Sequence, residues 1–418
     1  MTTSGADSTL NEAQAGPAGG AGTAVRPPLI AVAMYAVLLL TYVINAMDRQ
    51  LFPTIAQDVG KQFGFTLAEV GLQSTIFTLG MGLAGIPTGF LLARSSRKFV
   101  VLAGLALFSV ATLVTAYAVG FWDMLGYRFL SGLGEAMQLT ALLAIATSYF
   151  VRNRALAVGA VNFTFGVGAL VGPNLGAALR NSGGWRHPLI SFGVAGFVIL
   201  VLVALVVRPW LTEARASGEA RTGLEDFGAP RILSRDPMLL GVSTVFAGLA
   251  IYAYLGLYPT YLREQLHYSA SQAGLAVSMY GLGAFFSLVG GWLGDRVDFR
   301  KLLAVALVVS AVSGYVLFSG AGEVWLHLVL SFVYGAAISG VVYANLAAGI
   351  IKSVKRAIAS HGSGLFVATL YVPAAFSGGL FGVLVGQVGW TGAALIQICA
   401  FCLIAAVLAL AARRPAAV

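Results

Sequence analysis

The sequence predicts an all-α membrane protein with twelve transmembrane helices, arranged as two pseudo-symmetric six-helix bundles with both termini in the cytoplasm. Hydrophobic residues make up 58% of its 418 residues and charged residues only 10%, whereas soluble domains carry about 25% charged residues. The apolar residues fall into runs near the roughly 20 residues that cross a bilayer as a helix. The predicted spans are residues 29–56, 67–93, 99–119, 121–150, 155–181, 187–207, 237–265, 270–294, 301–320, 323–351, 358–388 and 390–412.

A polar linker at residues 208–236 divides these spans six and six, which predicts an N-terminal bundle at 29–207 and a C-terminal bundle at 237–412. Residues 1–28 are rich in Gly, Ala, Ser and Thr, a composition typical of a disordered cytoplasmic tail. Residues 413–418 form a second, short tail. Because no polar stretch is long enough to bury a core of its own, the sequence argues against a catalytic domain and against an enzyme.

The positive charges predict the orientation of the chain. A net charge of +9 is also typical of nucleic-acid binding proteins, but the positions of the charges argue against this interpretation. Nineteen of the 25 Lys and Arg residues fall in the tails, the linker and the loops on one side of the predicted membrane. Such an excess marks the cytoplasmic side. The sequence therefore predicts a multi-pass protein of the bacterial inner membrane, with the lipid bilayer and not nucleic acid as its partner. The four positive residues on the opposite side are Lys61, Arg180, Arg186 and Arg263.

The two halves share landmarks at similar offsets, which indicates an internal repeat. The second and eighth spans end in similar loops, at 89–98 and 291–301. The fifth and eleventh spans carry glycines every four residues, which let helices approach closely, and a Gly-Trp pair follows each span. The glycines are Gly168, Gly172 and Gly176 in the first half and Gly378, Gly382 and Gly386 in the second.

The two loops resemble the signature loop of the major facilitator superfamily, Gly-x-x-x-Asp-Arg-x-Gly-x-Arg-Lys, and the resemblance covers the chain after residue 28. It implies a monomer whose halves rock about a site near the bilayer midplane, with loop charges that hold the cytoplasmic side closed in one state. The second copy departs from the pattern only at Asp298. The first copy departs from it at Ala93, in place of the acid, and at Ser96, in place of the glycine, which shifts the expected gating role toward the second loop. The implied gating residues are Arg94, Arg97, Asp295, Arg296 and Arg300.

Four charged residues are predicted to lie inside the membrane. A charged side chain near the bilayer centre costs about 2.5–3.5 kcal/mol on insertion scales, so the adjacent Asp48 and Arg49 indicate a functional site or, alternatively, side chains that reach the headgroups. In the fourth span, Arg128 and Glu135 are seven residues apart, about 10.5 Å along a helix and nearly on one face. The four residues form either a structural lock between two helices or a network whose pairing changes between states.

We interpret the four residues as a proton-coupled anion site. Arg49 is always charged, and its planar guanidinium can grip a carboxylate with two hydrogen bonds. A substrate carboxylate on Arg49 removes a counter-charge from Asp48 and Glu135, which then take up protons more readily. The hypothesis assigns Arg49 to the substrate and Asp48, Glu135 and Arg128 to coupling. Protons are the coupling ion, and no metal or other cofactor is expected.

The same residues narrow the resemblance. Asp-Arg in the first span with Arg-x-x-x-Gly-x-x-Glu in the fourth is similar to the anion:cation symporters, which import organic anions with protons. This implies a small carboxylate or sugar acid as the substrate. Two alternatives stay open: spinster-type lysolipid transporters share the Asp-Arg and Glu positions, and the fifth span fits a pattern of proton-coupled drug antiporters. The residues of that pattern are Gly159, Gly168, Gly172, Pro173 and Gly176.

Tyrosines and amides are predicted to line the substrate cavity as stacking and hydrogen-bonding groups, although tyrosines in such spans also serve as packing or interfacial residues. The candidates from the second half are Tyr254, Tyr258, Tyr280, Tyr343, Asn345 and Tyr371. The candidates from the first half are Gln138 and Asn162.

Overall fold

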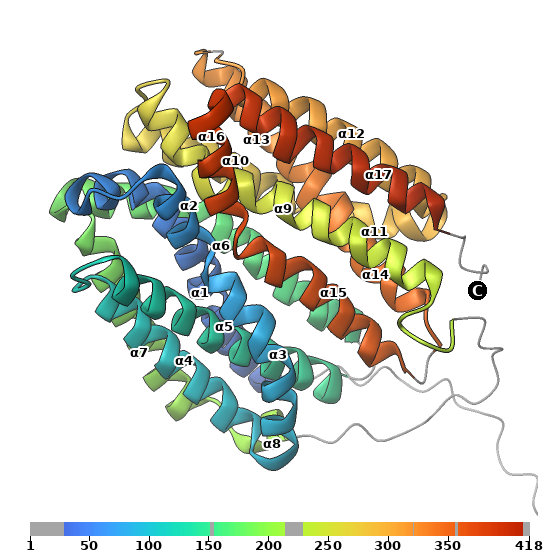
Figure 1. The fold of residues 1–418 in the computed structure, drawn as a ribbon. Coiled ribbons are helices and arrows are strands. Elements are labelled where there is room, and N and C mark those ends of the chain that lie inside the picture. The colour runs from blue at the N-terminus through green and yellow to red at the C-terminus, as the bar shows by residue number, and fades with distance from the viewer. Residues whose placement is uncertain (1–28, 151–153, 214–228, 321, 356–357, 413–418) are drawn as a thin grey trace, which may run out of the picture.

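The computed structural model describes residues 29–150, 154–213, 229–320, 322–355 and 358–412. Nearly all of these residues are helical, and the helices form two groups. In Figure 1, α1 to α8 (blue to green) make one group and α9 to α17 (yellow to red) make the other. The helical fold and its division into two parts are therefore confirmed. The predicted tails lie outside the described residues, as does most of the linker.

The first group contains seven longer helices and one short one. The short helix α8 (Pro209–Thr212) lies within the predicted linker and starts with a proline, whose missing N–H costs nothing at a first helical position. It is followed by Glu213, whose carboxylate accepts hydrogen bonds of 3.1 Å from the backbone N–H groups of Arg97 and Lys98. The linker is thus fastened to the start of α4. The longer helices are α1 Leu29–Phe63, α2 Leu67–Thr75, α3 Phe77–Arg94, α4 Arg97–Thr115, α5 Phe121–Tyr149, α6 Arg154–Gly183 and α7 Arg186–Val206.

The second group repeats this arrangement with two π-helical segments, η1 and η3, inserted in longer helices. Such turns widen the helix by one residue and commonly occur at functional sites. The elements are α9 Arg235–Glu264, α10 Ala270–Ala284, α11 Ser287–Arg296, α12 Phe299–Leu317, α13 Val324–Gly335, η1 Ala336–Tyr343, α14 Ala344–Lys352, α15 Ala359–Ala374, α16 Ser377–Ala394, η3 Leu395–Ala400 and α17 Phe401–Ala411.

Three spans that were predicted as continuous helices are broken. The span 358–388 divides into α15 and α16 between Ala374 and Ser377, and the other two spans are broken at equivalent places of the two halves. The span 67–93 divides into α2 and α3 at Ile76, and 270–294 divides into α10 and α11 at Phe285. Both breaks are tightened turns, in which the N–H of Leu79 donates to Ile76 and the N–H of Phe285 donates to Leu282, three residues back. The repeat of the two halves therefore extends to these breaks.

Ten stretches of the described residues are long and apolar enough to cross a membrane. One of them, Gly364–Ala411, covers most of the last two predicted spans. It bends at Gly389, whose φ of 72° is a conformation that favours glycine, at the predicted boundary between those spans. The count of twelve spans stays a prediction.

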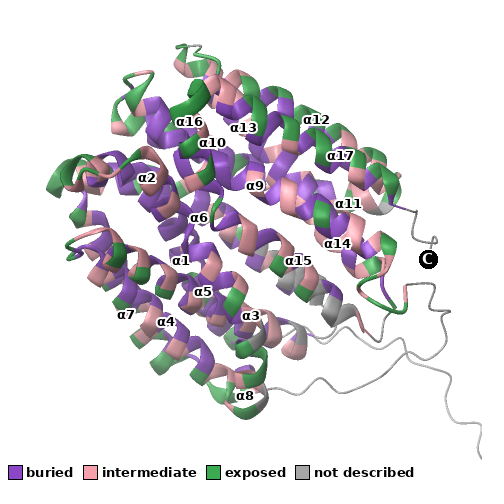
Figure 2. Ribbon diagram, viewed as in Figure 1, coloured by how far each residue is buried: buried purple, intermediate pink, exposed green. Residues whose placement is uncertain are grey.

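Buried residues gather where helices meet, and exposed ones lie around the outside of both groups (Figure 2). Many of the exposed side chains are large and apolar, such as Val198, Leu205 and Trp292. Contiguous apolar surface on a folded chain marks contact with lipid or a partner. The outer surface of both groups is therefore suited to lipid.

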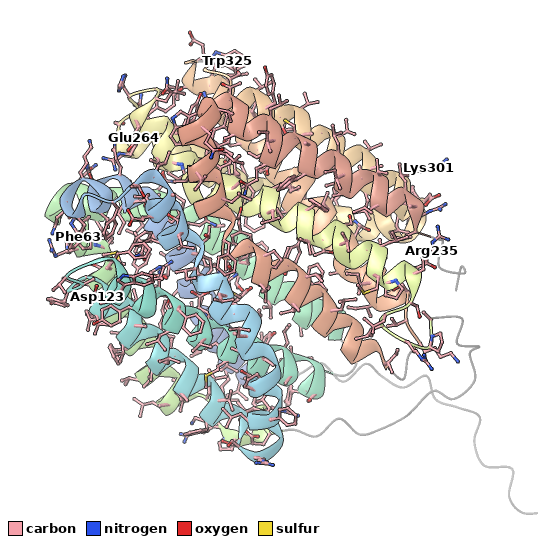
Figure 3. The ribbon with its side chains drawn as sticks, in the orientation of Figure 1. Phe63, Asp123, Arg235, Glu264, Lys301 and Trp325 are labelled. Atoms are coloured by element: carbon pink, nitrogen blue, oxygen red, sulfur yellow. The ribbon has the colours of Figure 1, made fainter. Side chains whose placement is uncertain are left out.

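The helix bundle has two ends, which Figure 3 marks by labelled residues. Phe63, Asp123 and Glu264 lie at one end, called here the Glu264 end. Arg235 and Lys301 lie at the other, called the Lys301 end. Helices α1 and α9 both run from the Lys301 end to the Glu264 end, and α5 runs the opposite way.

An ion-pair cluster of Asp58, Arg180 and Arg263 joins the two halves near the Glu264 end. Asp58 of α1 accepts hydrogen bonds of 2.7 and 2.8 Å from Arg180 of α6, in its own half. It also accepts bonds of 3.1 and 3.2 Å from Arg263 of α9, in the other half. All three side chains are partly exposed. The Arg263 bonds therefore hold the halves together at this end.

Close backbone contact between α2 and α16 adds to this closure. A Cβ added at Gly378 would lie 2.6 Å from the carbonyl carbon of Gly71, so only glycine fits both positions. The Thr75 hydroxyl donates to the carbonyl of Ala375 at 2.7 Å and accepts from the N–H of Gly378 at 3.3 Å. Side chain and backbone thus interlock between the halves.

Replacing Arg263 with glutamine is expected to open the Glu264 end more often, because the variant removes the contribution of the second half to the cluster. A partly exposed pair is worth about 1 kcal/mol, so we expect about a fivefold gain in the open population. A cysteine introduced at Ser74 should then react faster with a charged thiol reagent added at that end, since both native cysteines are buried.

Arg180→Gln is the matched control, because it removes an arginine from the same carboxylate but leaves the Arg263 bonds in place. Equal cysteine reactivity in the two variants would show that the cluster does not control opening.

Candidate functional site

The four intramembrane charges form two buried ion pairs between α1 and α5. Arg128 Nη1 donates to Asp48 Oδ2 at 2.6 Å, and both side chains are fully buried. Arg49 Nε donates to Glu135 Oε2 at 2.6 Å, with 5% of the Arg49 side chain exposed. The structure therefore brings together all four residues, and both pairs join the two helices. All four side chains are buried in the protein interior, which argues against side chains that reach the headgroups.

Close helix packing holds this site together. A Cβ added at Gly134 of α5 would lie 2.6 Å from the backbone nitrogen of Phe108 in α4, so glycine is required for this approach. The Thr112 hydroxyl, also on α4, lies 3.5 Å from Asp48 Oδ1. Helices α1, α4 and α5 therefore enclose Asp48 from three directions.

Aromatic rings surround both guanidinium groups. The Arg128 guanidinium carbon lies 5.2 Å from the ring centre of Phe52 and 5.4 Å from that of Phe77. The Arg49 carbon lies 5.5 Å from the ring centre of Tyr42 and 5.7 Å from that of Phe165. A cation over an aromatic face is stabilised by the ring quadrupole, by about 2 kcal/mol when desolvated. The rings therefore partly replace the water that these cations lose on burial.

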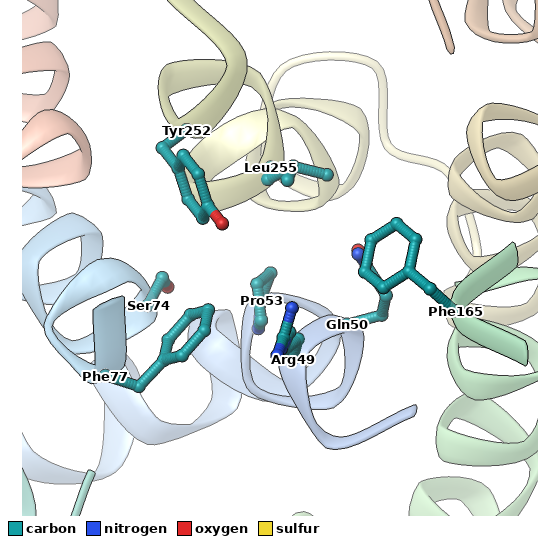
Figure 4. A pocket seen from close by; sticks show the side chains of 8 residues that line it. All are labelled: Arg49, Gln50, Pro53, Ser74, Phe77, Phe165, Tyr252 and Leu255. Atoms are coloured by element: carbon teal, nitrogen blue, oxygen red, sulfur yellow. The ribbon is translucent and has the colours of Figure 1, made fainter. Parts of the chain in front are cut away.

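Arg49 differs from Arg128 because it borders a cavity between the two halves (Figure 4). The cavity is narrow, with room for about one water molecule. In the described part of the chain, Arg49 Nη2 and the neighbouring Gln50 Oε1 are buried without a hydrogen-bond partner. Arg49 thus presents an unused donor beside this space. The lining residues are Arg49, Gln50, Pro53, Ser74, Phe77, Phe165, Tyr252 and Leu255.

Three of the predicted cavity tyrosines pack inside the second half instead. The rings of Tyr254 and Tyr258 stack with centres 4.5 Å apart, and Tyr280 lies 5.2 Å from Tyr254. The Tyr258 hydroxyl is 2.7 Å from Nδ1 of His327, which is also buried. These tyrosines form a packed aromatic column and are not among the residues that line the cavity of Figure 4.

The remaining candidates take other positions. The hydroxyls of Tyr343 and Tyr371 lie 3.3 Å apart, and Tyr371 is near Tyr252, with ring centres 6.3 Å apart. The Asn345 amide donates to the backbone carbonyls of Gly290 and Val341, both at 2.9 Å, which is a packing role. Gln138 is buried on α5 near Glu135, and the side chain of Asn162 lies outside the described part.

Three of the five predicted gating residues each contact a residue of their own half. Arg97 donates to the Thr212 carbonyl at 3.1 Å, and Arg300 pairs with Asp298 at 3.1 Å. The Arg296 guanidinium carbon lies 4.2 Å from the ring centre of Trp292. Arg94 is exposed, and the side chain of Asp295 lies outside the described part. The predicted gating role of these residues stays a prediction.

Several cavity residues were missed in the sequence: Gln50, Ser74, Phe77, Phe165 and Tyr252. Helix periodicity gives a signal for one of them. Tyr252 and Leu255 are three residues apart and share a face of α9, as do Tyr254, Tyr258 and Tyr261 on another face. The first face lines the cavity and the second packs within the second half. A prediction from the sequence therefore has to distinguish these two faces of α9.

Comparisons with known proteins agree with this geometry. The family model of the Major Facilitator Superfamily matches residues 38–247 and 240–418. The chain is 25% identical over 404 residues to the 4-hydroxybenzoate transporter PcaK of Pseudomonas putida, covering 86% of each protein. It is 26% identical over 278 residues to the probable L-galactonate transporter of Escherichia coli K12, covering 62% of this chain and 61% of that protein.

Among solved structures, a bacterial homologue of the human lysosomal transporter spinster superposes with a TM-score of 0.70. The superposition covers 92% of this chain and 93% of that one at 18% identity, so it shows a shared fold. The bacterial relatives and the ten apolar helices identify a multi-pass protein of the inner membrane. Because the family model covers both helical groups, the chain belongs to the Major Facilitator Superfamily, a family of transporters and not of enzymes.

Proposed function

We propose that this protein is a proton-coupled symporter that imports a small organic anion by alternating access, acting as a monomer. The observation that carries the proposal is the position of Arg49, which is bound to Glu135 and borders the cavity with a second nitrogen, Nη2, that has no partner among the described residues. One cation can thus serve a carboxylate of the protein or a carboxylate of the substrate.

Competition for Arg49 couples the two fluxes. A substrate carboxylate that binds Nη2 and Nε of Arg49 displaces Glu135 from Nε, because the guanidinium presents its donors in a fixed fork. Glu135, buried and left without its cation, takes up a proton, because an unpaired carboxylate in a low-dielectric site is strongly disfavoured. Asp48 keeps Arg128 as its partner and holds the second exchangeable charge of the network. Binding of the anion and uptake of a proton thereby become one event.

The lining of the cavity favours an aromatic acid over a sugar acid. Phe77, Phe165 and Tyr252 offer rings, and Pro53 and Leu255 are apolar. A sugar acid would need a hydrogen-bond partner for each buried hydroxyl, and besides Arg49 the lining offers only Gln50, Ser74 and the Tyr252 hydroxyl. The named substrates of the relatives include both 4-hydroxybenzoate and L-galactonate. The cavity chemistry is the reason to place aromatic carboxylates first.

We also propose that the chain crosses the membrane twelve times, in two bundles at 29–207 and 237–412 that are joined by a cytoplasmic linker. The Lys301 end carries most of the positive loops and is the cytoplasmic end. The Glu264 end, closed by the Asp58–Arg263 bonds and the Gly71–Gly378 contact, is then the outer end.

Proteoliposomes that contain a pH dye test the proposal directly. Adding an aromatic carboxylate outside is expected to acidify the interior, with a sugar acid giving a smaller response. If lysolipids are moved and carboxylates are not, the protein is a spinster-like lipid transporter, a reading that the spinster-like fold supports. Proton release on addition of cationic drugs would instead identify a drug antiporter.

Removing one member of the Asp48–Arg128 pair is expected to destabilise the folded protein. Arg128→Met leaves Asp48 buried without its cation and should lower the free energy of unfolding by about 3–5 kcal/mol. Replacing both residues, with Asp48→Leu, should restore much of this stability, because a buried pair and an apolar pair of similar size are often equally stable. Thermal unfolding in detergent measures both effects.

The double variant is expected to lose proton-coupled uptake although it folds. Full coupling in the double variant would mean that Asp48 and Arg128 only lock α1 to α5.

A further inference from the structure

We propose that Asn45 and Gln138 are positioning residues for the proton, which line a polar route from Glu135 toward the Lys301 end, separate from the substrate cavity. The inference rests on the proton coupling proposed above. It adds a path for the proton and two residues that have no part in the ion pairs.

Asn45 is the clearest evidence for a polar route in this region. Its side chain is fully buried on α1, and neither atom of its amide has a hydrogen-bond partner within the described residues. A buried polar group without a partner costs about 1–3 kcal/mol. A packed helix has no structural use for two such atoms, so a role in binding and orienting water explains Asn45 better than packing does.

The contacts of α1 settle which way Asn45 faces. Val43, Ala46 and Met47 pack against Gly168 of α6. Asn45 is two residues from Val43 and, at about 100° per residue, points roughly 160° away from it. Asn45 therefore shares the face of Asp48, whose contacts with Thr112 and Arg128 are made to α4 and α5.

Depth along the helices places Gln138 at about the same level as Asn45. Arg49 and Glu135 touch, so they mark one level. Because α1 and α5 run in opposite directions, Asn45, four residues before Arg49, lies about 6 Å nearer the Lys301 end, and Gln138, three residues after Glu135, lies about 4.5 Å nearer it. The two amides thus occupy nearly the same level, one step beyond the ion pair.

Unpaired polar atoms continue between the amides and the ion pairs. Gln138 Nε2 donates to the Gly134 carbonyl at 3.2 Å. Oε1 of Gln138 and Oε1 of Glu135 both have no hydrogen-bond partner in the described region. These donors and acceptors have the polar surroundings that ordered water requires.

The proton path follows from this chemistry. The carboxyl of Glu135 gives its proton to a water, and that water gives one of its own protons to the next water toward the Lys301 end. Each amide donates through Nδ2 or Nε2 and accepts through Oδ1 or Oε1, so it orients these waters without being ionised. When Glu135 loses its proton it re-forms its bond to Arg49, which returns the site to the arrangement in the structure.

The substrate cavity lies on a different side of α1. Gln50, which lines it, is five residues from Asn45 and points about 140° away. Arg49 stands between the two regions. The anion and the proton therefore reach the same ion pair from different directions.

Asn45→Leu in the full-length protein tests the path, with Gln138→Leu as an independent second variant. Two assays are compared in proteoliposomes: accumulation of 4-hydroxybenzoate driven by a pH gradient, which needs net proton release, and exchange of labelled for unlabelled 4-hydroxybenzoate, which does not. Each variant is expected to slow accumulation by about tenfold while exchange is preserved. This is less than the roughly 100- to 10,000-fold effect of a group that itself transfers the proton, because the amides only orient water. Asn45→Ser, which keeps a donor and an acceptor, should retain accumulation.

Gln50→Leu is the contrasting variant on the cavity side. It is expected to raise the half-saturating substrate concentration in both assays and to leave the number of protons per anion unchanged. Equal slowing of exchange and accumulation in Asn45→Leu and Gln138→Leu would overturn the inference, as would normal accumulation in both. Failure of the proposed function is distinguishable, because the unmodified protein would then show no proton movement with any carboxylate.

Discussion

Replacing Arg49 with alanine is expected to abolish anion uptake and the acidification that accompanies it. Within the described residues, Arg49 is the charged residue with an unpartnered donor at the cavity, and its loss also leaves Glu135 without its 2.6 Å partner. A hydrogen bond to a charged group is worth about 1.5–3 kcal/mol, which corresponds to roughly a 10- to 150-fold weaker binding of the anion. Substrate binding by calorimetry and uptake in proteoliposomes measure the two effects separately.

Arg49→Lys provides the matched control, since it keeps the charge and loses the planar fork. We expect weak binding with proton coupling retained, because a lysine can still exchange one carboxylate for another as a point charge. Wild-type affinity in Arg49→Ala would remove Arg49 from the anion site and reopen the lysolipid assignment.

Glu135→Gln is expected to separate anion exchange from proton movement. Glutamine has nearly the shape of protonated glutamate and cannot release a proton, so the protein should remain in its proton-loaded form. Exchange of internal for external anion should continue, whereas accumulation driven by a pH gradient should disappear. The comparison of both rates in one proteoliposome preparation makes the measurement.

The control for this carboxylate is Glu69→Gln at the exposed start of α2. Glu69 forms a capping box with Thr66, and glutamine supports the same motif, so transport should be unchanged. Accumulation that survives in Glu135→Gln would transfer the proton to Asp48 or to a group in the second half.

The buried charges could be predicted from the sequence because they contradict their surroundings. Asp48, Arg49, Arg128 and Glu135 each interrupt an apolar segment, and the energetic cost of that placement marks them without any knowledge of the fold. Their pairing could not be read in the same way. Asp48 and Arg49 are neighbours in sequence and have opposite charges, yet each binds a residue of α5: the acid binds Arg128 and the base binds Glu135.

The second half was harder to predict because tyrosine fits both packing and binding. Tyr254 and Tyr258 face the interior of their own half, where Tyr258 meets the buried His327. Tyr252, only two residues from Tyr254, faces the cavity. A tyrosine has the same apolar ring and polar hydroxyl in both settings, so residue type alone does not distinguish a packing tyrosine from a cavity tyrosine. The orientation of α9 about its axis determines which of its tyrosines face the cavity.

The broken helices show a similar limit for the fold. Hydropathy places the spans 67–93 and 270–294 correctly, but the apolar signal continues through the breaks at Ile76 and Phe285. These breaks arise from three-residue backbone bonds and cross-half contacts such as that of Thr75 with Ala375, which local sequence does not report.

The contact between Gly71 and Gly378 offers a means to arrest the transport cycle. Neither glycine has space for even one methyl group while the Glu264 end is closed. Gly378→Ala would therefore act as a wedge and populate the conformation that the closed arrangement excludes, without touching any charged residue. A protein held in that conformation would present its anion site to the opposite compartment, which would allow antibodies and inhibitors specific to that face to be selected.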